Sequence, residues 1–424
     1  MNGKHGFLQR VIQGLTDACY IWRQEMKLNV KDEGVLMFVI LVPLAYPLLY
    51  SWIYNNELVH EVPVAVVDES HSALSREFAR QCDASPDVFI KAYVNDMREA
   101  RRMMERQEVS GIYRIPHDFS TNVNSMRQAT VAVYCDMSLM LNYKAVFQTA
   151  QAVSTEMGKK IQISISGNYT HREDEISTQP LDFDEIPLFN PSGGYGSFIL
   201  PAVLMLIIQQ TLLLGIGLSA GTARENNRFT DLIPVSRHYH GIFRIVLGKS
   251  MCYLMIYSVV AAYLSVVVPR IFNFPALGQA GDLFAVLFPY VLSCIFFGLT
   301  LSCLIRYREN VMLLVVFTSV PLMFLSGVSW PQSSISGVWQ AISYVFPSTN
   351  GVRAFVRINS MGGTLSDVMP EYRALWIQAA IYFFLACIVF RYQIMRLRSH
   401  ILQRLAYIRR KRNIRRKLRA RVRL

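Results

Sequence analysis

Residues 198–220 read FILPAVLMLIIQQTLLLGIGLSA, an apolar run long enough to cross a bilayer as one helix. A spanning helix needs about 20 such residues. With 52% hydrophobic residues among 424, the chain is too apolar for an ordinary soluble protein. The sequence therefore predicts an α-helical polytopic membrane protein with six spans: Val35 to Tyr54, Phe198 to Ala220, Ile242 to Val268, Leu283 to Ile305, Val311 to Ser329 and Leu375 to Phe390. No small-residue cleavage pattern follows the first run, so we interpret it as a retained span.

The positive charge of the chain lies in one tail. Residues 391–424 hold 14 Lys or Arg and no Asp or Glu, which accounts for the whole net charge of +13. A basic segment directly after a span is typical of the cytosolic side, where it contacts anionic lipid. Nucleic acid is the other anionic partner for such a tail. Because no stacking platform or folded module accompanies the tail, we predict no nucleic-acid partner.

Charge also predicts which side of the membrane each segment faces. The segments before the first span and after the second are rich in Lys and Arg, whereas residues 55–190 hold 13 basic and 20 acidic side chains. Basic loops stay in the cytosol. We therefore expect a multi-pass protein of the inner (plasma) membrane, with both termini cytosolic and residues 55–190 extracytosolic.

This pattern divides the chain into five expected parts. They are a cytosolic amphipathic interfacial helix (1–32), span 1 (33–54), an inserted extracytosolic α/β domain with a long helical stalk (55–190), spans 2–6 (191–392) and a basic cytosolic tail (393–424). In the first part Phe7, Leu8, Val11, Ile12 and Leu15 recur at helical spacing, while Arg10, Gln13, Asp17 and Arg23 take the other face.

The inserted domain alternates strand and helix patterns. The strands are expected at Val62 to Val67, Val88 to Val94, Val109 to Ile115 and Thr130 to Tyr134, and the helices at Ser72 to Gln81, Asp96 to Gln107 and Ser138 to about Ile165. Two of the seven cysteines, Cys82 and Cys135, fall here; a bond between them and two free thiols both remain open.

A second informative stretch, residues 321–357, reads PLMFLSGVSWPQSSISGVWQAISYVFPSTNGVRAFVR. Pro331 and Pro347 interrupt it on either side of a segment that is too short to cross a membrane. Broken backbone at membrane depth is tolerated where it lines a wet cavity, so we expect a re-entrant element at 331–347. A helix that only lies on the bilayer is the alternative. The candidate path or gate residues are Gln209, Gln210, Pro331, Trp339, Pro347, Arg353 and Arg357.

No catalytic or metal-binding pattern was found in the sequence. Gly248-Lys249-Ser250 resembles the end of a phosphate-binding loop, but that motif needs a glycine at the position of Phe243, and it opens an apolar span here. His238 and His240 lie in a loop without a metal-site pattern. Ionisable groups are nearly absent from the spans, which argues against a proton or sodium relay. We therefore expect no cofactor, no enzyme activity of its own, and an energy source outside the chain.

The layout and local motifs together resemble the membrane (permease) subunit of a type-2 ATP-binding-cassette exporter, in the branch with a large extracytosolic domain between the first and second spans. The resemblance covers nearly the whole chain. It lies in VAVVDESHSALSREFA (64–79), VSGIYRIPHDFS (109–120), FNPSGGYGSFILPAVL (189–204) and TARENNRFTDLIPVSR (222–237). In the last block Arg224, Glu225 and Thr230 match the family's coupling segment, whereas Asn227 and Phe229 depart from it.

The resemblance implies a dimer of this chain or of the chain with a close paralogue, docked on a separate cytosolic ATPase subunit that binds the ATP. A coupling loop at 222–241, with Arg224, Glu225, Arg228, Thr230 and Arg237, would receive the ATPase's closure. The expected cargo is an amphiphilic, drug-like or lipid-like substrate, and a periplasmic membrane-fusion adaptor is a further partner to consider. The rival interpretations are a non-transporting membrane scaffold or secretion-assembly component and, more weakly, an embedded enzyme.

Overall fold

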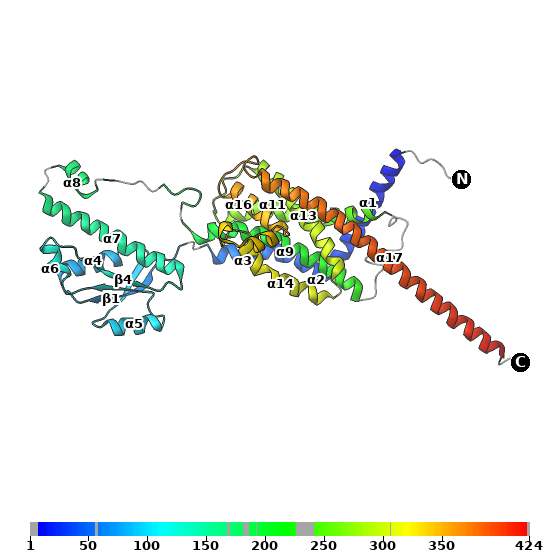
Figure 1. Ribbon diagram of the computed structural model, residues 1–424, viewed down its shortest axis with the longest axis horizontal. Coiled ribbons are helices and arrows are strands. Elements are labelled where there is room, and N and C mark those ends of the chain that lie inside the picture. Colours follow the sequence, from blue (N-terminus) through cyan, green and yellow to red (C-terminus); the bar gives the residue numbers. More distant parts are fainter. Residues whose placement is uncertain are drawn as a thin grey trace. The chain divides into compact units, whose positions relative to one another are not determined.

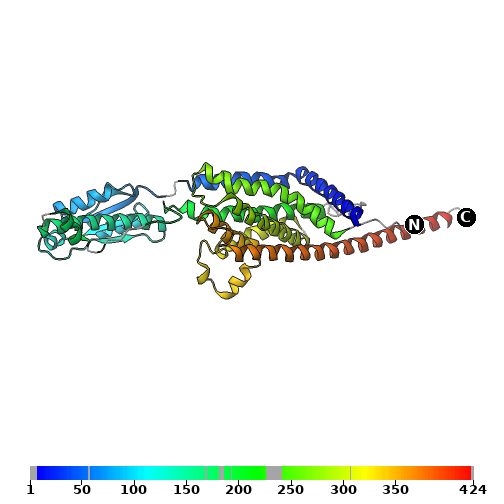
Figure 2. The same ribbon diagram turned by 90° about the horizontal axis from the view of Figure 1, so that it is seen from above.

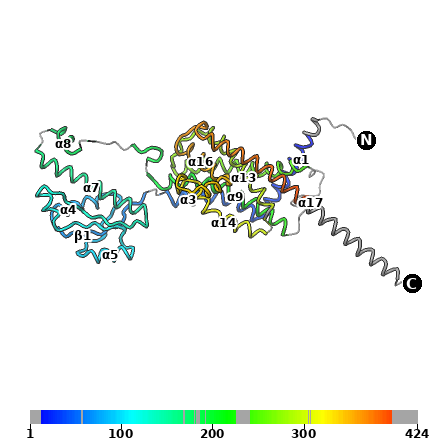
Figure 3. The backbone as a smooth tube through the Cα atoms, in the orientation of Figure 1, coloured from blue at the N-terminus to red at the C-terminus, as the bar shows by residue number. Residues whose placement is uncertain are grey.

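The computed structural model describes residues 7–55, 58–167, 170–179, 181, 186–191, 193–225, 241–305 and 307–421, apart from the side chains of 7–11, 304 and 396–421 (Figure 3). The chain divides into two compact units. We call Met1–Asn55 with Leu188–Leu424 the helical unit, and Asn56–Pro187 the α/β unit.

Within the described residues, six helices of the helical unit are long and apolar enough to cross a membrane. They lie side by side in a bundle (Figures 1 and 2). Each coincides with a predicted span, and the last begins at Met369 rather than Leu375. The helices are Glu33–Ile53 (α2 Glu33–Leu36, the π-helical η1 Met37–Leu41, α3 Val42–Ile53), α9 Tyr195–Glu225, Ile242–Ile271 (α11 Ile242–Ala262, the π-helical η3 Tyr263–Val267, α12 Val268–Ile271), α13 Ala280–Leu304, α14 Arg308–Leu325 and α17 Met369–Arg421.

Helix α9 lies at the centre of the helical unit. Of its most apolar stretch 83% is buried, against 17% for α14, and it packs against α3, α13 and α14. Gly217 and Gly221, about one turn apart, face the start of α14. A Cβ at Gly217 would lie 2.5 Å from Val311 Cγ1, and one at Gly221 would lie 3.0 Å from Arg308 Cα. Small residues at this spacing let two membrane helices approach closely.

Three short helices follow α14: the 3₁₀ turn η4 Gln332–Ser334, α15 Gly337–Ser343 and α16 Pro347–Asn359. Pro331 directly precedes the first, and Pro347 opens the third, where a missing N–H costs no helical hydrogen bond. Helix α15 is too short to cross a bilayer. The chain is therefore interrupted where the prolines predict, while re-entry of this segment into the membrane stays a prediction.

The N-terminal helix α1 (Phe7–Lys31) has two faces, but not the ones that the sequence predicts. Asp17 and Glu25 are buried with Ile21, whereas Ile12 and Leu15 are exposed. The prediction that Asp17 takes an outward polar face is wrong, because its carboxylate pairs with a base on a neighbouring helix. Apolar side chains are left on the outer face.

The α/β unit is built on a four-stranded sheet of order β2-β1-β3-β4, in which β1 runs parallel to β2 and β3, and β4 runs antiparallel to β3. Helices α4 and α7 cover one face and α5 covers the other (Figure 1). The predicted strands and helices all have counterparts here, with ends that differ by a few residues. The elements are β1 Val62–Asp68, α4 Ala73–Asp83, β2 Val88–Tyr93, α5 Met97–Glu105, β3 Gly111–Ile115, α6 Phe119–Asn124, β4 Ala132–Cys135, α7 Met140–Ser166 and α8 His171–Thr178.

The two cysteines of the α/β unit are free thiols. Cys82 is fully buried under α7, and burial raises its thiol pKa to about 12. We expect iodoacetamide at about pH 8 to leave Cys82 unmodified in the folded protein and to modify it after denaturation, since the thiolate is the reacting form. Mass spectrometry of the full chain measures this, with the exposed Ser138→Cys variant as the reactive reference. Equal rates at the two positions would contradict the buried placement.

Candidate functional site

Polar contacts gather at the end of the helical unit where α1, the last turn of α9 and the first turns of α11 and α14 meet; we call this the α1 end. Glu25 Oε2 accepts a hydrogen bond from Lys249 Nζ at 2.6 Å, and the two side chains are only 5% and 9% exposed. Tyr253 donates to the other oxygen of the same carboxylate at 3.2 Å. One turn away from Lys249, Arg244 pairs with Asp17 at 2.5 Å. Helix α1 is thus fixed to α11 by two ion pairs.

These contacts explain the Gly248-Lys249-Ser250 motif. A Cβ at Gly248 would lie 2.7 Å from Ile21 Cβ and 2.8 Å from the Ala18 carbonyl oxygen, so glycine allows α1 to approach α11. Lys249 neutralises Glu25, and Ser250 donates to the Leu247 carbonyl of its own helix. In this protein the motif forms a contact between helices α1 and α11.

A second set of contacts joins α2, α9 and α14. Asp32 caps α2 by accepting from the Gly34 amide at 3.1 Å, and it pairs with Arg308 at 3.4 Å. The Arg308 amide, at the first residue of α14, donates to Glu225 Oε1 at 2.7 Å. A carboxylate at a helix N-terminus accepts a hydrogen bond from an N–H that the helix leaves free, and its negative charge is attracted to the positive end of the helix dipole.

A similar contact lies beside it. Arg224 donates to the Cys303 carbonyl at 3.1 Å, near the end of α13, where a cation is favourable for the same reason. The last turn of α9 therefore holds the adjoining ends of α13 and α14 in place.

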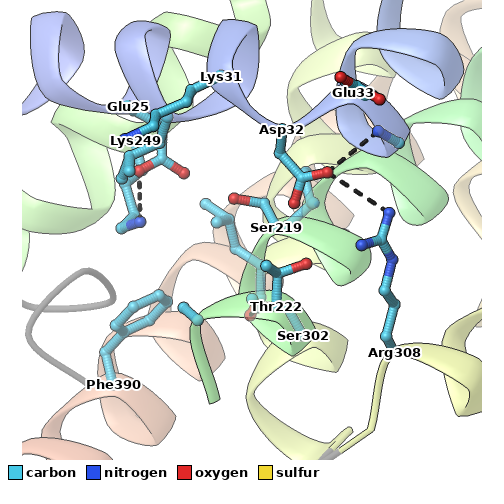
Figure 4. Close-up of a pocket in the computed structure, with 16 residues that line it drawn as sticks. Glu25, Lys31, Asp32, Glu33, Ser219, Thr222, Lys249, Ser302, Arg308 and Phe390 are labelled. Atoms are coloured by element: carbon cyan, nitrogen blue, oxygen red, sulfur yellow. Dashed lines mark hydrogen bonds and ion pairs between the residues drawn. The ribbon is translucent and has the colours of Figure 1, made fainter. Parts of the chain in front are cut away.

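These contacts surround a cavity of about 480 Å³ (Figure 4). The Glu25–Lys249 pair lies on one side of it and the Asp32–Arg308 pair on another, with the hydroxyl side chains Ser219, Thr222 and Ser302 among the lining residues. Apolar side chains complete the wall: Leu28, Ile216, Ala220, Ala223, Leu299 and Phe390. Thr222 Oγ1 is buried and has no hydrogen-bond partner among the residues that the structure describes. The cavity combines apolar surface with side chains of both signs of charge.

Two of the five predicted coupling residues, Arg224 and Glu225, belong to this α1 end. Arg228, Thr230 and Arg237 lie outside the described residues. In the structure Glu25, Asp32, Lys249 and Arg308 also lie at the α1 end. A signal for one of them is present in the sequence, because a lysine inside an apolar span needs a partner; the identity of that partner is not readable from it.

The predicted path or gate residues lie in the opposite part of the helical unit, around α16. Gln209 is fully buried on α9, and its Oε1 accepts from the Ser348 amide at 2.7 Å. Because Ser348 follows Pro347 at the start of α16, this bond satisfies a buried N–H that the helix itself leaves free. Gln210, the next residue, is half-buried, and its side chain forms no hydrogen bond with any residue in the described ranges.

The two predicted arginines are held separately. Arg353 Nε donates to the Ser326 carbonyl at 3.3 Å, and its guanidinium lies 5.6 Å from the centre of the Tyr344 ring. Arg357 pairs with Glu371 at 3.1 Å. These contacts tie α16 to the end of α14, to the segment after α15 and to the start of α17. Pro331 and Trp339 are exposed and take no part in them.

A multi-pass membrane protein with polar contacts at both parts of its bundle is the class that this fold and these contacts define. Residues 34–388 match the family described as ABC-2 family transporter protein. The chain therefore belongs to the ABC-2 transporter family, which confirms the family that its motifs resemble.

Relatives of the chain include a protein named Probable multidrug ABC transporter permease YbhR from Escherichia coli (strain K12). It is 20% identical over 333 residues, which cover 77% of this chain and 84% of the relative. The protein of the same name from Escherichia coli O157:H7 matches to the same extent.

The Glu25–Lys249 pair yields a stability prediction. Lys249→Met leaves the Glu25 carboxylate buried without its cation, and breaking a buried pair costs about 3–5 kcal/mol. We expect a lower midpoint of thermal unfolding for the purified protein, and partial recovery when the charges are exchanged in Glu25→Lys with Lys249→Glu. Lys144→Met, at an exposed position on α7, is the control. An unchanged midpoint in Lys249→Met would show that the pair does not hold α1.

The hydrogen bond between Gln209 and the Ser348 amide yields a second stability prediction. Gln209→Leu leaves the Ser348 amide unsatisfied in the core, at a cost of about 1–3 kcal/mol, whereas Gln209→Glu keeps an acceptor at the N-terminus of α16. We expect a clear drop in the unfolding midpoint for the leucine variant and a smaller one for the glutamate variant. Gln210→Leu, one residue away, should have little effect. Equal losses for Gln209→Leu and Gln210→Leu would contradict the capping role.

Proposed function

We propose that the chain is the permease subunit of an ATP-driven exporter, which as a dimer moves an amphiphilic, drug-like or lipid-like substrate out of the cytosol or the inner leaflet. The observation that carries this proposal is the family match over residues 34–388. The YbhR relatives are named as probable multidrug permeases, which supports the substrate class. A separate cassette ATPase subunit would supply the energy, since the sequence has no phosphate-binding loop of its own.

The proposed orientation places the α1 end in the cytosol and residues 55–190 outside the inner membrane. The distribution of basic residues along the sequence supports it. The α1 end would then face the ATPase, with the predicted coupling loop at 222–241 starting in the last turn of α9. An adaptor protein outside the membrane would continue the route from the α/β unit.

The contacts at the α1 end suggest how closure of the ATPase would reach the spans. A force on the end of α9 acts on α14 through the bond between Glu225 and the Arg308 amide, and on α13 through Arg224. Displacement of α1 acts on α11 through the Glu25–Lys249 pair. Helices joined by buried ion pairs and capping bonds shift as units, which suits a rigid transmission of movement.

The substrate would enter the cavity at the α1 end and leave past α16. The cavity is lined by both charged and apolar side chains, which suits an amphiphilic substrate. Near the exit, Gln209 and Arg353 hold α16 against α9 and α14, so the release of these contacts would open the path. Helix α16 and the residues 331–347 before it form the proposed gate.

Transport itself can be tested in liposomes that contain the chain and a cassette ATPase encoded beside its gene. We expect ATP-dependent movement of rhodamine 6G or of a fluorescent phospholipid, which a scaffold protein would not show. Glu225→Arg should reduce the flux at least about tenfold, a loss of roughly 1.4 kcal/mol in coupling, because a cation replaces the acceptor of the Arg308 amide.

The control is Glu309→Arg, an equal charge change at an exposed position one residue from Arg308. It should leave flux and ATPase co-purification unchanged. Full transport and normal ATPase binding in Glu225→Arg would show that the coupling assignment is wrong. If the unmodified complex shows no ATP-dependent flux, the result would instead favour a non-transporting scaffold.

A further inference from the structure

The sheet of the α/β unit has an open edge at β4. The Asp136 amide donates to the Ser110 carbonyl at 3.0 Å, so Ser110 and Asp136 occupy a hydrogen-bonding position of the antiparallel ladder. Such pairs alternate with non-bonded ones along the ladder. The pairs Gly111–Cys135 and Tyr113–Val133 are therefore non-bonded, and Val133 and Cys135 direct their N–H and C=O groups away from β3. No residue in the described part of the chain pairs with these groups.

The opposite edge of the same sheet, at β2, is partly blocked by a side chain of the unit itself. At β2 the Ile90 amide donates to the Asp83 carboxylate at 2.8 Å, so a side chain of the unit itself occupies a backbone donor there. Proteins usually block exposed edges in such ways, because an open edge is a template for another strand. The contrast marks β4 as the edge that is left available.

A groove of about 500 Å³ runs beside this open edge. It is walled by Met97 and Met104 from α5 on one face of the sheet and by Tyr143 and Phe147 from α7 on the other. The two aromatic rings are stacked with centres 5.7 Å apart. Methionine and aromatic side chains adapt to varied apolar partners, so the walls offer contacts for alternate side chains of an added strand.

The positive charge of Arg101 at the groove indicates which kind of strand would bind there. Arg101 lines it, is exposed, and forms no ion pair with any described residue. Two neighbouring arginines are already engaged, Arg98 with Asp96 and Arg106 with Glu108. A free cation at the wall favours a segment that carries Asp or Glu. A second copy of the chain fits poorly, because pairing β4 with β4 would bring the Arg101 side chains of both copies to one shared groove.

We propose that β4 and this groove bind an extended segment of another protein, in which apolar and acidic residues alternate, as a fifth strand of the sheet. The backbone edge supplies main-chain hydrogen bonds, while the groove and Arg101 select the side chains, which is the general mode of strand addition. The inference rests on the α/β unit alone and does not depend on the transport role.

The test uses the full chain in lipid nanodiscs and a displayed library of random peptides of about eight residues, within the range of natural strand lengths. We expect enrichment of sequences that alternate apolar residues with Asp or Glu and lack proline. Arg101→Glu should weaken their binding about tenfold, whereas Arg80→Glu, an exposed arginine on α4, should not.

Val133→Pro removes an outward N–H without removing a bond to β3, and proline is compatible with an edge strand. It should abolish binding while Cys82 stays protected from iodoacetamide, which shows that the unit is folded. Hydrogen exchange supplies a direct readout: the bound peptide should slow exchange at the Val133 and Cys135 amides and leave the Tyr134 amide, already bonded to β3, unchanged.

Three results would overturn the proposal. The first is that no peptide is enriched. The second is that enriched peptides bind Val133→Pro or Arg101→Glu as tightly as the unmodified chain. The third is that mild oxidation links Cys135 between two copies in high yield and the Val133 amide is already protected without peptide, because a second copy then occupies the edge.

Discussion

The helical unit depends on one constraint: a polar group placed among packed apolar helices must find its partner inside the protein, since lipid offers none. The constraint applies most strongly to helix α9, because this helix is buried on nearly all sides. Its single deeply buried amide, Gln209, caps α16, and its last turn, with Arg224 and Glu225, holds the ends of α13 and α14. One helix therefore carries polar contacts to both the α1 end and α16.

The same constraint explains why α1 lies where it does. A lysine inside α11 is tolerated because it pairs with Glu25, and the buried carboxylate is tolerated because Lys249 and Tyr253 both donate to it. Gly248 has no side chain to keep α1 away from α11, and the ion pair between Arg244 and Asp17 extends the contact between the two helices. An N-terminal helix that by composition is merely amphipathic becomes an integral part of the bundle, with its apolar residues Ile12 and Leu15 left on the outside.

The α/β unit follows the physics of a soluble sheet. Its two faces are covered by helices, so its surface chemistry is decided at the two edges. The β2 edge is partly occupied by Asp83. Among the residues that the structure describes, nothing pairs with the outer edge of β4, and Arg101 in the groove beside it has no ion-pair partner. An open edge strand can take up a further strand without disturbing the core of the unit.

The sequence predicts the six apolar helices, the interruptions at Pro331 and Pro347, the strands and helices of the α/β unit and the transporter family, because each depends on local periodicity, proline geometry or short motifs. It also brought Gln209, Arg224 and Glu225 to attention. The partners of such residues could be assigned only from the folded chain, because the groups that meet are far apart in the sequence. Glu25 and Lys249 are separated by 224 positions, and Gln209 and Ser348 by 139. The outward face predicted for Asp17 was wrong for the same reason, because a distant arginine, not the pattern around it, determines where a charged side chain is stable.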